Sequence, residues 1–388
     1  MIRFLISCGG TGGHLSPGIA LAEGLRERGH ESRLLISRKQ VDARLSAKYP
    51  DLGFERMPGT GFSWRPLALA RCLFSQAQAF WFCVRLIRRF RPQAVIGFGG
   101  FTSAPLVLAA WVSGVPAALH ESNRVPGLAV RTLGRLARRV YLPPGITIPG
   151  IRAAVTRHAG QPVRREIARR PQAAARAALG LDPHQRLLVV LGGSQGAGPL
   201  NAWVREHRET LAAAGIQLYV VTGMGKGEEA VLESTARNGA KVRAVFVPFS
   251  DRIADLMSAA DLVLSRAGAG TLAELIRCAT PAILVPYPQA ADDHQRANAE
   301  YFAQQGGGVL VPQTRLDGLL TTVLDLAGND ARLQEFRANL QRLDRASALE
   351  AMLADLEGVA RGETEGGETR GAGSARADTD TRASLSAT

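Results

Sequence analysis

Short apolar runs alternate with amphipathic stretches along most of this chain, and turns rich in glycine or polar residues join them. The first run, at residues 2–6, predicts a buried strand, and the apolar positions that recur between residues 19 and 25 predict a helix after the glycines of residues 9–13. Further apolar runs of this kind stand at 31–37, 94–100, 116–121, 186–191, 216–223, 242–251, 261–266 and 281–288. This alternation predicts an α/β fold of parallel sheets with helices on both faces.

The length of the chain and a repeated glycine turn predict two domains. A chain of 388 residues exceeds what one hydrophobic core usually supports. The turn at residues 9–13 is echoed at residues 192–196, again between an apolar run and a helical pattern. We therefore expect two Rossmann-like, doubly wound domains that face each other across a cleft. The stretch from 143 to 162, marked by proline and glycine, predicts the boundary, and residues 359–388 predict a disordered tail.

Basic residues are unevenly distributed, and they indicate an anionic partner. The formal net charge is +13, which favours nucleic acid, an anionic membrane surface or phosphorylated metabolites. Residues 124–176 hold twelve arginines against one acid, Glu166, and residues 65–91 hold six arginines and no acid. No sequence pattern of a nucleic-acid-binding module accompanies them, so we expect no nucleic-acid partner. Each arginine taken singly is also compatible with a solvated surface.

The cysteines and the apolar stretches bear on the cellular setting. Cys8, Cys72, Cys83 and Cys278 lack pair or metal spacing, which predicts free thiols. The first apolar run is too short for a signal peptide. Residues 104–119 are the best candidate for a membrane span, but they are shorter than about 20 residues and contain two prolines, so no span is predicted.

Residues 66–91 predict a long amphipathic helix that admits two placements. Packing against a core is favoured by an apolar stripe of Leu73, Ala77, Phe80, Val84 and Ile87. The alternative is that the aromatic and basic portion of the helix rests on an anionic bilayer, through Phe80, Trp81, Phe82, Arg85, Arg88 and Arg89. The two placements are compatible if they use different faces.

The glycine turns are the first candidates for ligand binding. Glycines let the backbone approach a ligand closely, because no Cβ stands in the way. A helix that starts at such a turn presents free N–H groups and the positive end of its dipole, which favours anions. His14 stands at the start of the first such helix, where it can take a proton or cap the helix. The next polar cluster follows a strand, where open α/β sheets keep their ligands, and comprises His120, Glu121 and Asn123.

Three kinds of nucleotide chemistry use glycine turns of this type. A nicotinamide fingerprint is met only by Gly268, Gly270 and Ala273, with Asp292 and Asp293 about 20 residues later. A P-loop is excluded, because no glycine-rich turn is followed by Lys-Ser or Lys-Thr. The third is a transferase for a nucleotide-activated sugar, in which backbone amides of the second glycine turn cradle a diphosphate.

The sugar-nucleotide interpretation gives roles to several polar residues. Arg266 and Arg164 would neutralise the diphosphate. Glu274 would accept hydrogen bonds from ribose hydroxyls, although it is equally compatible with a solvated acid near the start of a helix. Neutral donors and acceptors that suit sugar hydroxyls, or that cap helices, follow at His294, Gln295 and Asn298.

Seven motifs carry a resemblance to a known enzyme family. They are GGTGGH at 9–14, GFGGFTSAP at 97–105, HESNRVPG at 120–127, GQPVR at 160–164, GGSQGA at 192–197, SRAGAGTLAEL at 265–275 and DDHQRANA at 292–299. In order and spacing they resemble the bacterial undecaprenyl-diphospho-muramoylpentapeptide β-N-acetylglucosaminyltransferases of glycosyltransferase family 28, over nearly all of residues 1–345. The resemblance implies the GT-B fold, with domains at 1–158 and 159–343 and a helix at about 344–358 that returns to the first domain.

The resemblance also implies a reaction and its partners. N-acetylglucosamine passes from UDP-N-acetylglucosamine to the muramoyl C4 hydroxyl of lipid I, with inversion at the anomeric carbon, and forms lipid II of peptidoglycan synthesis. No cofactor and no metal are expected, because the predicted folded region has no paired Asp-x-Asp motif. Besides the two substrates, the expected partner is an anionic membrane surface, at the cytoplasmic face of the inner membrane, on which the basic first half docks a peripheral protein.

Carried onto the matching positions, the resemblance assigns residues to both substrates. The acceptor side is expected at Thr11, Gly12, Gly13 and His14, with His14 as the base or as a cation on the acceptor phosphate. The UDP-N-acetylglucosamine site, with Arg266 added from the charge argument, is expected at Thr11, Gly12, Gly13, Asn123, Arg164, Ser194, Gln195, Ser250, Arg266, Ala269, Gly270, Glu274 and Gln295. Within it the resemblance places Ser194 and Gln195 at the diphosphate, Ser250 near the uracil and Glu274 on the ribose.

The chain departs from the family pattern at two positions, and three other functions remain as alternatives. GQPVR replaces the more usual GNPVR, and Gly270 stands where a bulkier residue is common, which puts local sugar contacts in question. The same fold also serves a UDP-N-acetylglucosamine 2-epimerase or another glycolipid glycosyltransferase. A different class is a non-catalytic nucleotide-sugar-binding protein.

Overall fold

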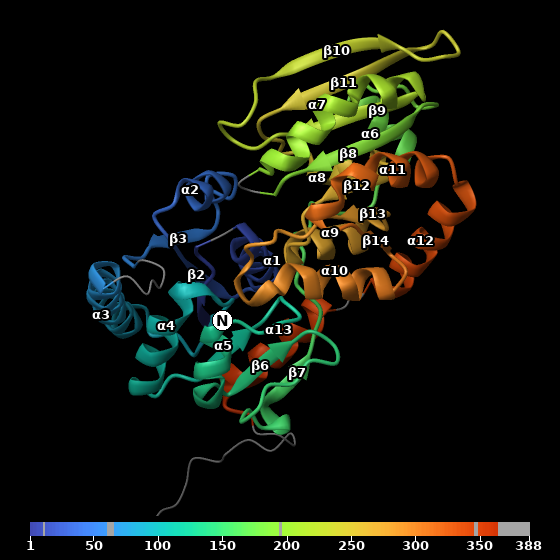
Figure 1. The fold of residues 1–388 in the computed structure, drawn as a ribbon. Helices are drawn as coiled ribbons and strands as arrows, with labels where there is room; N and C mark the ends of the chain where they lie inside the picture. The colour runs from blue at the N-terminus through green and yellow to red at the C-terminus, as the bar shows by residue number, and fades with distance from the viewer. Residues whose placement is uncertain (11, 60–65, 194–195, 345–347, 364–388) are drawn as a thin grey trace, which may run out of the picture.

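Two sheets form the framework of the protein (Figure 1). The computed structural model describes residues 1–10, 12–59, 66–193, 196–344 and 348–363. The first sheet contains β1 (Arg3–Ser7), β2 (Glu31–Ile36), β3 (Gly53–Arg56), β4 (Ala94–Gly97), β5 (Ala117–His120), β6 (Arg139–Leu142) and β7 (Thr156–His158). The second contains β8 (Arg186–Leu191), β9 (Ile216–Val221), β10 (Ala230–Thr235), β11 (Lys241–Val247), β12 (Leu262–Ser265), β13 (Ala282–Leu284) and β14 (Gly308–Leu310).

Apart from the edge strands β7 and β10, the strands of the two sheets follow one order. The first sheet has the order β3-β2-β1-β4-β5-β6-β7, and the second has β10-β11-β9-β8-β12-β13-β14. In each, the direction of winding reverses beside the first strand, between β1 and β4 and between β8 and β12. Ligands of doubly wound sheets bind at the carboxyl ends of the strands at such a reversal. The predicted pair of Rossmann-like domains is confirmed, and the predicted glycine turns follow the strands at both reversals.

One strand departs from the predicted parallel pattern. β10 runs antiparallel to β11 at the edge of the second sheet, whereas the sequence predicted parallel strands throughout. Most side chains of β10 are exposed, so its residues lack the apolar run by which the other strands were recognised. An antiparallel neighbour needs only a short connection, and residues 236–240 supply it here.

Helices cover both faces of each sheet (Figure 1). The first unit has α1 (Gly12–Glu27), α2 (Gln40–Ser46), α3 (Pro66–Phe90), α4 (Gly100–Val112) and α5 (Leu128–Leu133). The second has α6 (Gln172–Ala178), α7 (Gly198–Ala213), α8 (Ile253–Ala259), α9 (Ala269–Cys278), α10 (His294–Gln304), α11 (Leu319–Ala327) and α12 (Asp330–Leu343). In β1, Phe4 and Ile6 enter one hydrophobic cluster and Leu5 enters another, because alternate side chains of a strand point to opposite faces.

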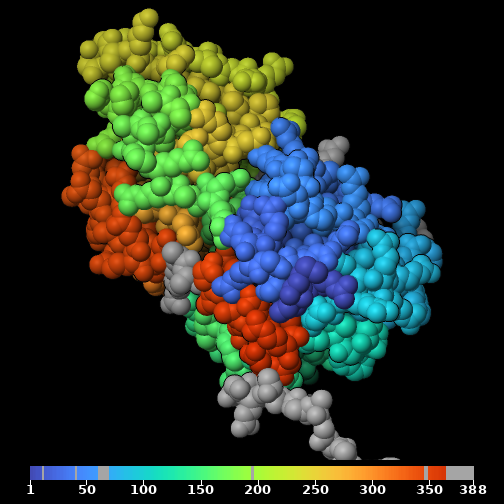
Figure 2. Space-filling model, turned by 180° about the vertical axis from the view of Figure 1, so that it is seen from behind, coloured from blue at the N-terminus to red at the C-terminus, as the bar shows by residue number. Residues whose placement is uncertain are grey.

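The last helix, α13 (Ala348–Arg361), packs on the first unit. Leu353 is fully buried in the cluster that contains β1 and α1. Gly24 of α1 permits this approach, because a Cβ there would lie 2.6 Å from Leu353 Cδ1. Figure 2 shows the red C-terminal segment against the blue N-terminal residues. The helix continues past the predicted end at residue 358 because Val359 is also buried, and the remainder of the predicted tail, residues 364–388, lies outside the described residues.

α3 buries a different stripe from the predicted one. Leu73 and Ala77, which we placed in the core-facing stripe, are exposed, and Leu73 keeps 63% of its surface. Val84 and Ile87 are buried as predicted. The buried face also includes Cys72, Ala79, Cys83, Leu86 and Phe90. Apolar residues occupy more than one face of this helix, so helical periodicity alone allowed two registers.

Two further sequence predictions concern the membrane and the thiols. Within the described residues, no helix combines the length and the apolar character needed to cross a bilayer. All four cysteines are buried and no disulfide joins any two of them, as predicted. Burial raises the pKa of Cys83 and of Cys278 to about 12, so both thiols stay protonated at neutral pH.

Candidate active site

A cavity of about 570 Å³ lies between the two units, at the carboxyl ends of their strands. A volume of this size is typical of sites for small molecules. The first unit contributes Gly13, His14, Ser122 and Asn123 to its wall. The second unit contributes Gly192, Gly193, Gly196, Ala197, Gly198, Pro199, Lys226, Arg266, Gly268, Ala269, Gly270, Thr271, Glu274, Tyr287, His294 and Gln295. His14 and Glu274, far apart in the sequence, therefore face one shared space.

The N-terminal ends of several helices meet at this cavity. The first turns of α1, α7, α9 and α10 all contribute to its wall. Among the described residues, no side chain at the N-cap position accepts a hydrogen bond from α7 or α9, which leaves backbone N–H groups at their first turns for a ligand. α1 and α9 approach closely, because a Cβ on Gly270 would lie 3.8 Å from the Cα of Gly13. Since helix N-termini carry partial positive charge, the cavity favours an anionic ligand.

His14 packs against the glycine turn that precedes α4. Gly100 in this turn has a left-handed backbone (φ +70°), and a Cβ there would lie 3.1 Å from His14 Nδ1. The pKa of His14 is lowered to about 4, chiefly by burial; Asp42 opposes this shift, and the charges of His294 and Lys39 add to it. His14 is therefore uncharged at neutral pH and able to accept a proton.

A carboxylate that the sequence analysis did not single out holds the first glycine turn. Asp42 of α2 is fully buried. Its Oδ2 accepts hydrogen bonds from the backbone N of Gly10 at 2.9 Å, from the N of Ser37 at 2.9 Å and from the Oγ of Ser37 at 2.6 Å. Lys39 Nζ donates to the carbonyl of Gly10 at 2.8 Å. These contacts fix the backbone that leads into His14. The sequence did not single out Asp42, because nothing in the pattern around a short helix shows which backbone groups an acid will contact.

Acid is expected to destabilise the protein through two buried histidines. Burial also lowers the pKa of His120 to about 4, like that of His14. The unfolded chain binds a proton at each histidine below about pH 6.5 and the folded chain only below about pH 4. The free energy of unfolding should therefore fall as the pH falls from 6.5 to 4, by at most about 1.4 kcal/mol per pH unit for each histidine.

Chemical denaturation between pH 7 and pH 4 measures this slope. His120→Gln should reduce the slope, because it removes one of the two groups, and His184→Gln, at an exposed position, should leave it unchanged. Equal slopes for the parent protein and His120→Gln would contradict the assignment.

Glu274 is paired with an arginine that the sequence analysis placed at the phosphates. Arg164 Nη2 donates to Glu274 Oε1 at 3.2 Å. Arg164 Nη1 donates to Glu166 Oε1 at 2.6 Å and to the hydroxyl of Tyr49 at 3.3 Å. Burial raises the pKa of Glu274, and Arg164 opposes this shift. The alternative of a solvated Glu274 is wrong, and Arg164 is a buried partner of Glu274 that does not line the cavity.

Asn123 stands where the two units touch. Its backbone N and its Nδ2 donate to Glu121 Oε1, and its Oδ1 accepts from Asn298 Nδ2 at 3.1 Å. The buried Asn298 also accepts from the backbone N of Arg124 at 2.9 Å and donates to the carbonyl of Ala267 at 3.1 Å. Asn298 therefore fixes the polar wall of the first unit against the glycine turn of the second.

The other predicted site residues differ in their placement. Gln295 lines the cavity, and its Oε1 accepts from the backbone N of Tyr287 at 3.0 Å. Arg266 also lines it; its Nη1 donates to the carbonyls of Val285 and Pro286 and its Nη2 to Gln313, so these contacts fix its guanidinium in the wall. Gly13, Ala269 and Gly270 lie in the wall as predicted.

Some predicted residues do not reach the cavity or are not described. Ser250, expected near the uracil, does not line the cavity, and its Oγ accepts from the backbone N of Arg252. Gly12 begins α1. Thr11, Ser194 and Gln195 lie outside the described residues.

Sequence analysis missed a lysine in the cavity wall. Lys226 lines the cavity, and its Nζ donates to the carbonyl of Gly196 at 3.2 Å. The signal was present, because Lys226 stands within a third glycine turn, residues 223–227, which follows β9. Lys226 places a positive charge beside the turn that was predicted to cradle a diphosphate. Thr271 and Tyr287 also line the wall and were not predicted.

The two acids that a nicotinamide-binding site would need, Asp292 and Asp293, are not part of the cavity wall. Asp292 instead pairs with Arg131 at 2.8 Å. Within the ranges that the structure describes, no group of three histidine, cysteine, aspartate or glutamate side chains is arranged to hold a metal ion.

Two doubly wound units, with an anion-favouring cavity between their glycine turns, form the GT-B fold, and two family matches make the chain a glycosyltransferase. Residues 4–142 match the glycosyltransferase family 28 N-terminal domain, and residues 187–352 match the glycosyltransferase family 28 C-terminal domain.

Known proteins of similar sequence and structure narrow this class. The chain is 59% identical over 361 residues to the UDP-N-acetylglucosamine–N-acetylmuramyl-(pentapeptide) pyrophosphoryl-undecaprenol N-acetylglucosamine transferase of Opitutus terrae, covering 93% of this chain and 96% of that protein. The crystal structure of Acinetobacter baumannii MurG matches with a TM-score of 0.68 at 23% identity, over 92% of this chain and 99% of that one. The structure of a putative UDP-N-acetylglucosamine 2-epimerase from Listeria monocytogenes has a TM-score of 0.67 at 13% identity, over 92% of this chain and 96% of that one. The chain belongs to the MurG group of glycosyltransferase family 28.

Proposed function

We propose that this protein transfers N-acetylglucosamine from UDP-N-acetylglucosamine to N-acetylmuramyl-(pentapeptide) pyrophosphoryl-undecaprenol, lipid I, and so forms lipid II. The observation that carries the proposal is that His14 and Glu274 share one cavity, at which helix N-termini from both units converge. The sequence likeness to the Opitutus terrae transferase supports the choice of substrates.

The proposed donor site uses the second unit. The free N–H groups at the starts of α7 and α9, together with Lys226, suit the diphosphate. Glu274, fixed by Arg164, accepts hydrogen bonds from the ribose. These groups are in place before reaction, so they stabilise the negative charge that grows on UDP as it leaves.

The proposed chemical step is a direct displacement. The C4 hydroxyl oxygen of the acceptor bonds to the anomeric carbon while the bond from that carbon to the UDP oxygen breaks. The electron pair leaves with UDP, and His14, uncharged at neutral pH, takes the hydroxyl proton. Attack opposite to the leaving group inverts the anomeric carbon.

A single assay tests the proposal against its alternatives. The protein is incubated with labelled UDP-N-acetylglucosamine, with and without a lipid I analogue. We expect UDP release and a labelled disaccharide lipid only when the acceptor is present. Release of UDP without acceptor would replace the transferase with a 2-epimerase, and binding of the sugar nucleotide without any release would replace it with a binding protein.

We propose that the protein reaches its lipid-linked acceptor as a peripheral protein at the cytoplasmic face of the inner membrane. Neighbouring helices α3 and α4 expose large apolar side chains, namely Leu73, Phe74, Trp81, Leu108, Trp111 and Val112. Exposed arginines accompany them on α3, at Arg71, Arg85, Arg88 and Arg89. Apolar side chains with surrounding basic groups suit the interface of an anionic bilayer.

Charged substitutions on α3 are expected to weaken membrane binding. Leu73→Glu with Phe74→Glu removes two exposed apolar side chains, and each loss should cost roughly tenfold in affinity for vesicles that contain anionic lipid. Sedimentation with such vesicles measures the effect. Val231→Glu with Leu232→Glu, at exposed positions of β10, is the matched control and should bind like the parent protein. Equal binding by both double variants would exclude α3 as the docking surface.

A further inference from the structure

A second cavity lies at the far end of the second sheet from the active-site cavity. It has a volume of about 480 Å³ and lies between the segment before α6, α8, the C-terminal end of α9 and α12. Thr280, which precedes β13, lines it, so the cavity is at the amino ends of the strands. We call it the rear pocket.

Three guanidinium groups line the rear pocket, and only one of them has a close carboxylate partner. Arg170 Nη1 pairs with Asp255 Oδ1 at 2.5 Å. Arg169 is exposed and has no ion-pair partner within the part of the chain that the structure describes. Arg337 of α12 is 3.5 Å from Asp261 Oδ1, and its Nη2 makes no hydrogen bond among the described residues although it is buried.

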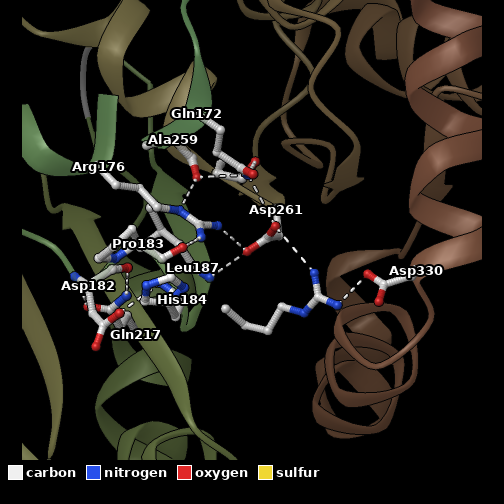
Figure 3. Close-up of polar contacts among 12 residues, drawn as sticks. Gln172, Arg176, Asp182, Pro183, His184, Leu187, Gln217, Ala259, Asp261 and Asp330 are labelled. Carbon is white, nitrogen blue, oxygen red and sulfur yellow. Dashed lines mark hydrogen bonds and ion pairs between the residues drawn. The ribbon is translucent and has the colours of Figure 1, made fainter. Parts of the chain in front are cut away.

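Asp261 neutralises Arg337 only in part, because other donors share its carboxylate (Figure 3). Its Oδ2 accepts from Arg176 Nη2 at 2.5 Å and from the backbone N of Leu187 at 2.8 Å. Its Oδ1 accepts from Gln172 Nε2 at 3.2 Å. The carboxylate of Asp261 therefore has little hydrogen-bonding capacity left for the guanidinium of Arg337.

The environment of Arg337 is positive even after Asp261 is counted. Arg186 lies 3.5 Å from the same Asp261 oxygen and pairs with Asp330. Burial lowers the pKa of Arg337; Asp261 opposes this shift, and the charges of Arg186 and Arg169 add to it. A buried charge without a full partner is costly, and an incoming anion offsets that cost.

We propose that the rear pocket binds a small phosphorylated metabolite, whose phosphate group bridges Arg169 and Arg337. Guanidinium groups bind phosphate oxygens in pairs of hydrogen bonds, and the volume of the rear pocket suits a small molecule. Arg337 keeps only 24% of its side chain exposed, which suits a recessed small-molecule site better than a flat macromolecular surface. This site is separate from the donor and acceptor positions of the proposed reaction.

Calorimetric titration with inorganic phosphate and with pyrophosphate tests the proposal on the full chain, with UDP in excess to occupy the active-site cavity. We expect binding that Arg169→Gln and Arg337→Gln each weaken by about tenfold, and that Arg337→Lys partly restores. Arg169 has no ion-pair partner among the described residues, so its variant separates a loss of binding from a loss of folding. Arg342→Gln, at an exposed position of the same helix, is the matched control and should bind like the parent protein.

Two results would overturn the proposal. One is that neither phosphate nor pyrophosphate binds once UDP is present. The other is that Arg342→Gln weakens binding as much as Arg169→Gln, since that pattern means diffuse attraction to a basic surface. Failure of the transfer assay leaves this experiment interpretable, because it follows binding to named arginines and not turnover.

Discussion

His14→Ala is expected to lower kcat by about a hundredfold to ten-thousandfold, which is the usual contribution of a positioned general base. The affinity for UDP should not change, because His14 belongs to the wall of the first unit and the donor groups belong to the second. Steady-state turnover at saturating lipid I analogue measures the effect, and UDP titration supplies the check on folding.

The pH dependence of the parent enzyme distinguishes two roles of His14. The pKa of His14 in the free enzyme is about 4. The value of kcat/KM should therefore stay level from neutral pH down to about pH 4, and then fall as His14 becomes protonated. The acceptor diphosphate is anionic and favours the charged imidazole, so the pKa seen in kcat should be higher. If His14 instead serves only as a cation on the acceptor phosphate, His14→Ala should raise the KM for the acceptor and leave kcat unchanged.

Glu274→Gln is expected to raise the KM for UDP-N-acetylglucosamine by roughly tenfold to a hundredfold, the range for a hydrogen bond to a charged group. The side chain keeps its shape, but the charge that orders Arg164 and attracts the ribose hydroxyls is lost. The thermal midpoint should also fall, because Arg164 is buried and loses one of its carboxylates. Initial rates over a range of donor concentrations measure the effect.

Glu166→Gln is the matched control for this change. Glu166 binds the same guanidinium through Nη1, but it does not line the cavity. It should therefore lower the thermal midpoint without raising the KM for the donor. Similar KM values for both variants would show that Glu274 acts only by holding Arg164, and the proposed ribose contact would be withdrawn.

The framework was predictable because apolar runs and glycine turns are local signals. β1, β8 and β12 were each recognised from a short apolar run that ends in a glycine turn. β10 was missed because an exposed edge strand buries little and needs no apolar run. The stripe on α3 was misplaced because Leu73 is apolar and yet faces solvent. Hydrophobic patterning alone cannot separate an apolar side chain that faces the core from one that is exposed at the surface.

The sequence predicted several of the residues that line the cavity, but it did not predict the hydrogen bonds that fix them. His14, Asn123 and Glu274 were brought together as expected, since each follows a strand at the reversal or at the same edge of its sheet. The contact of Arg164 with Tyr49 was not predictable, because Tyr49 comes from a distant segment and no local pattern reports that contact. The same holds for Asp42, whose partners were fixed only by the folded turn.

The return of α13 to the first unit has a mechanical consequence. The chain passes between the two units twice, once after β7 and once between α12 and α13. These two connections oppose any sliding of one unit past the other. The motion that they oppose least is a rotation of the units about the line that joins the two connections. Lys48 of the first unit pairs with Asp251 of the second, and a partly exposed pair of this kind costs about 1 kcal/mol or less to break. A rotation of this kind would widen the cavity without shifting its two walls along each other.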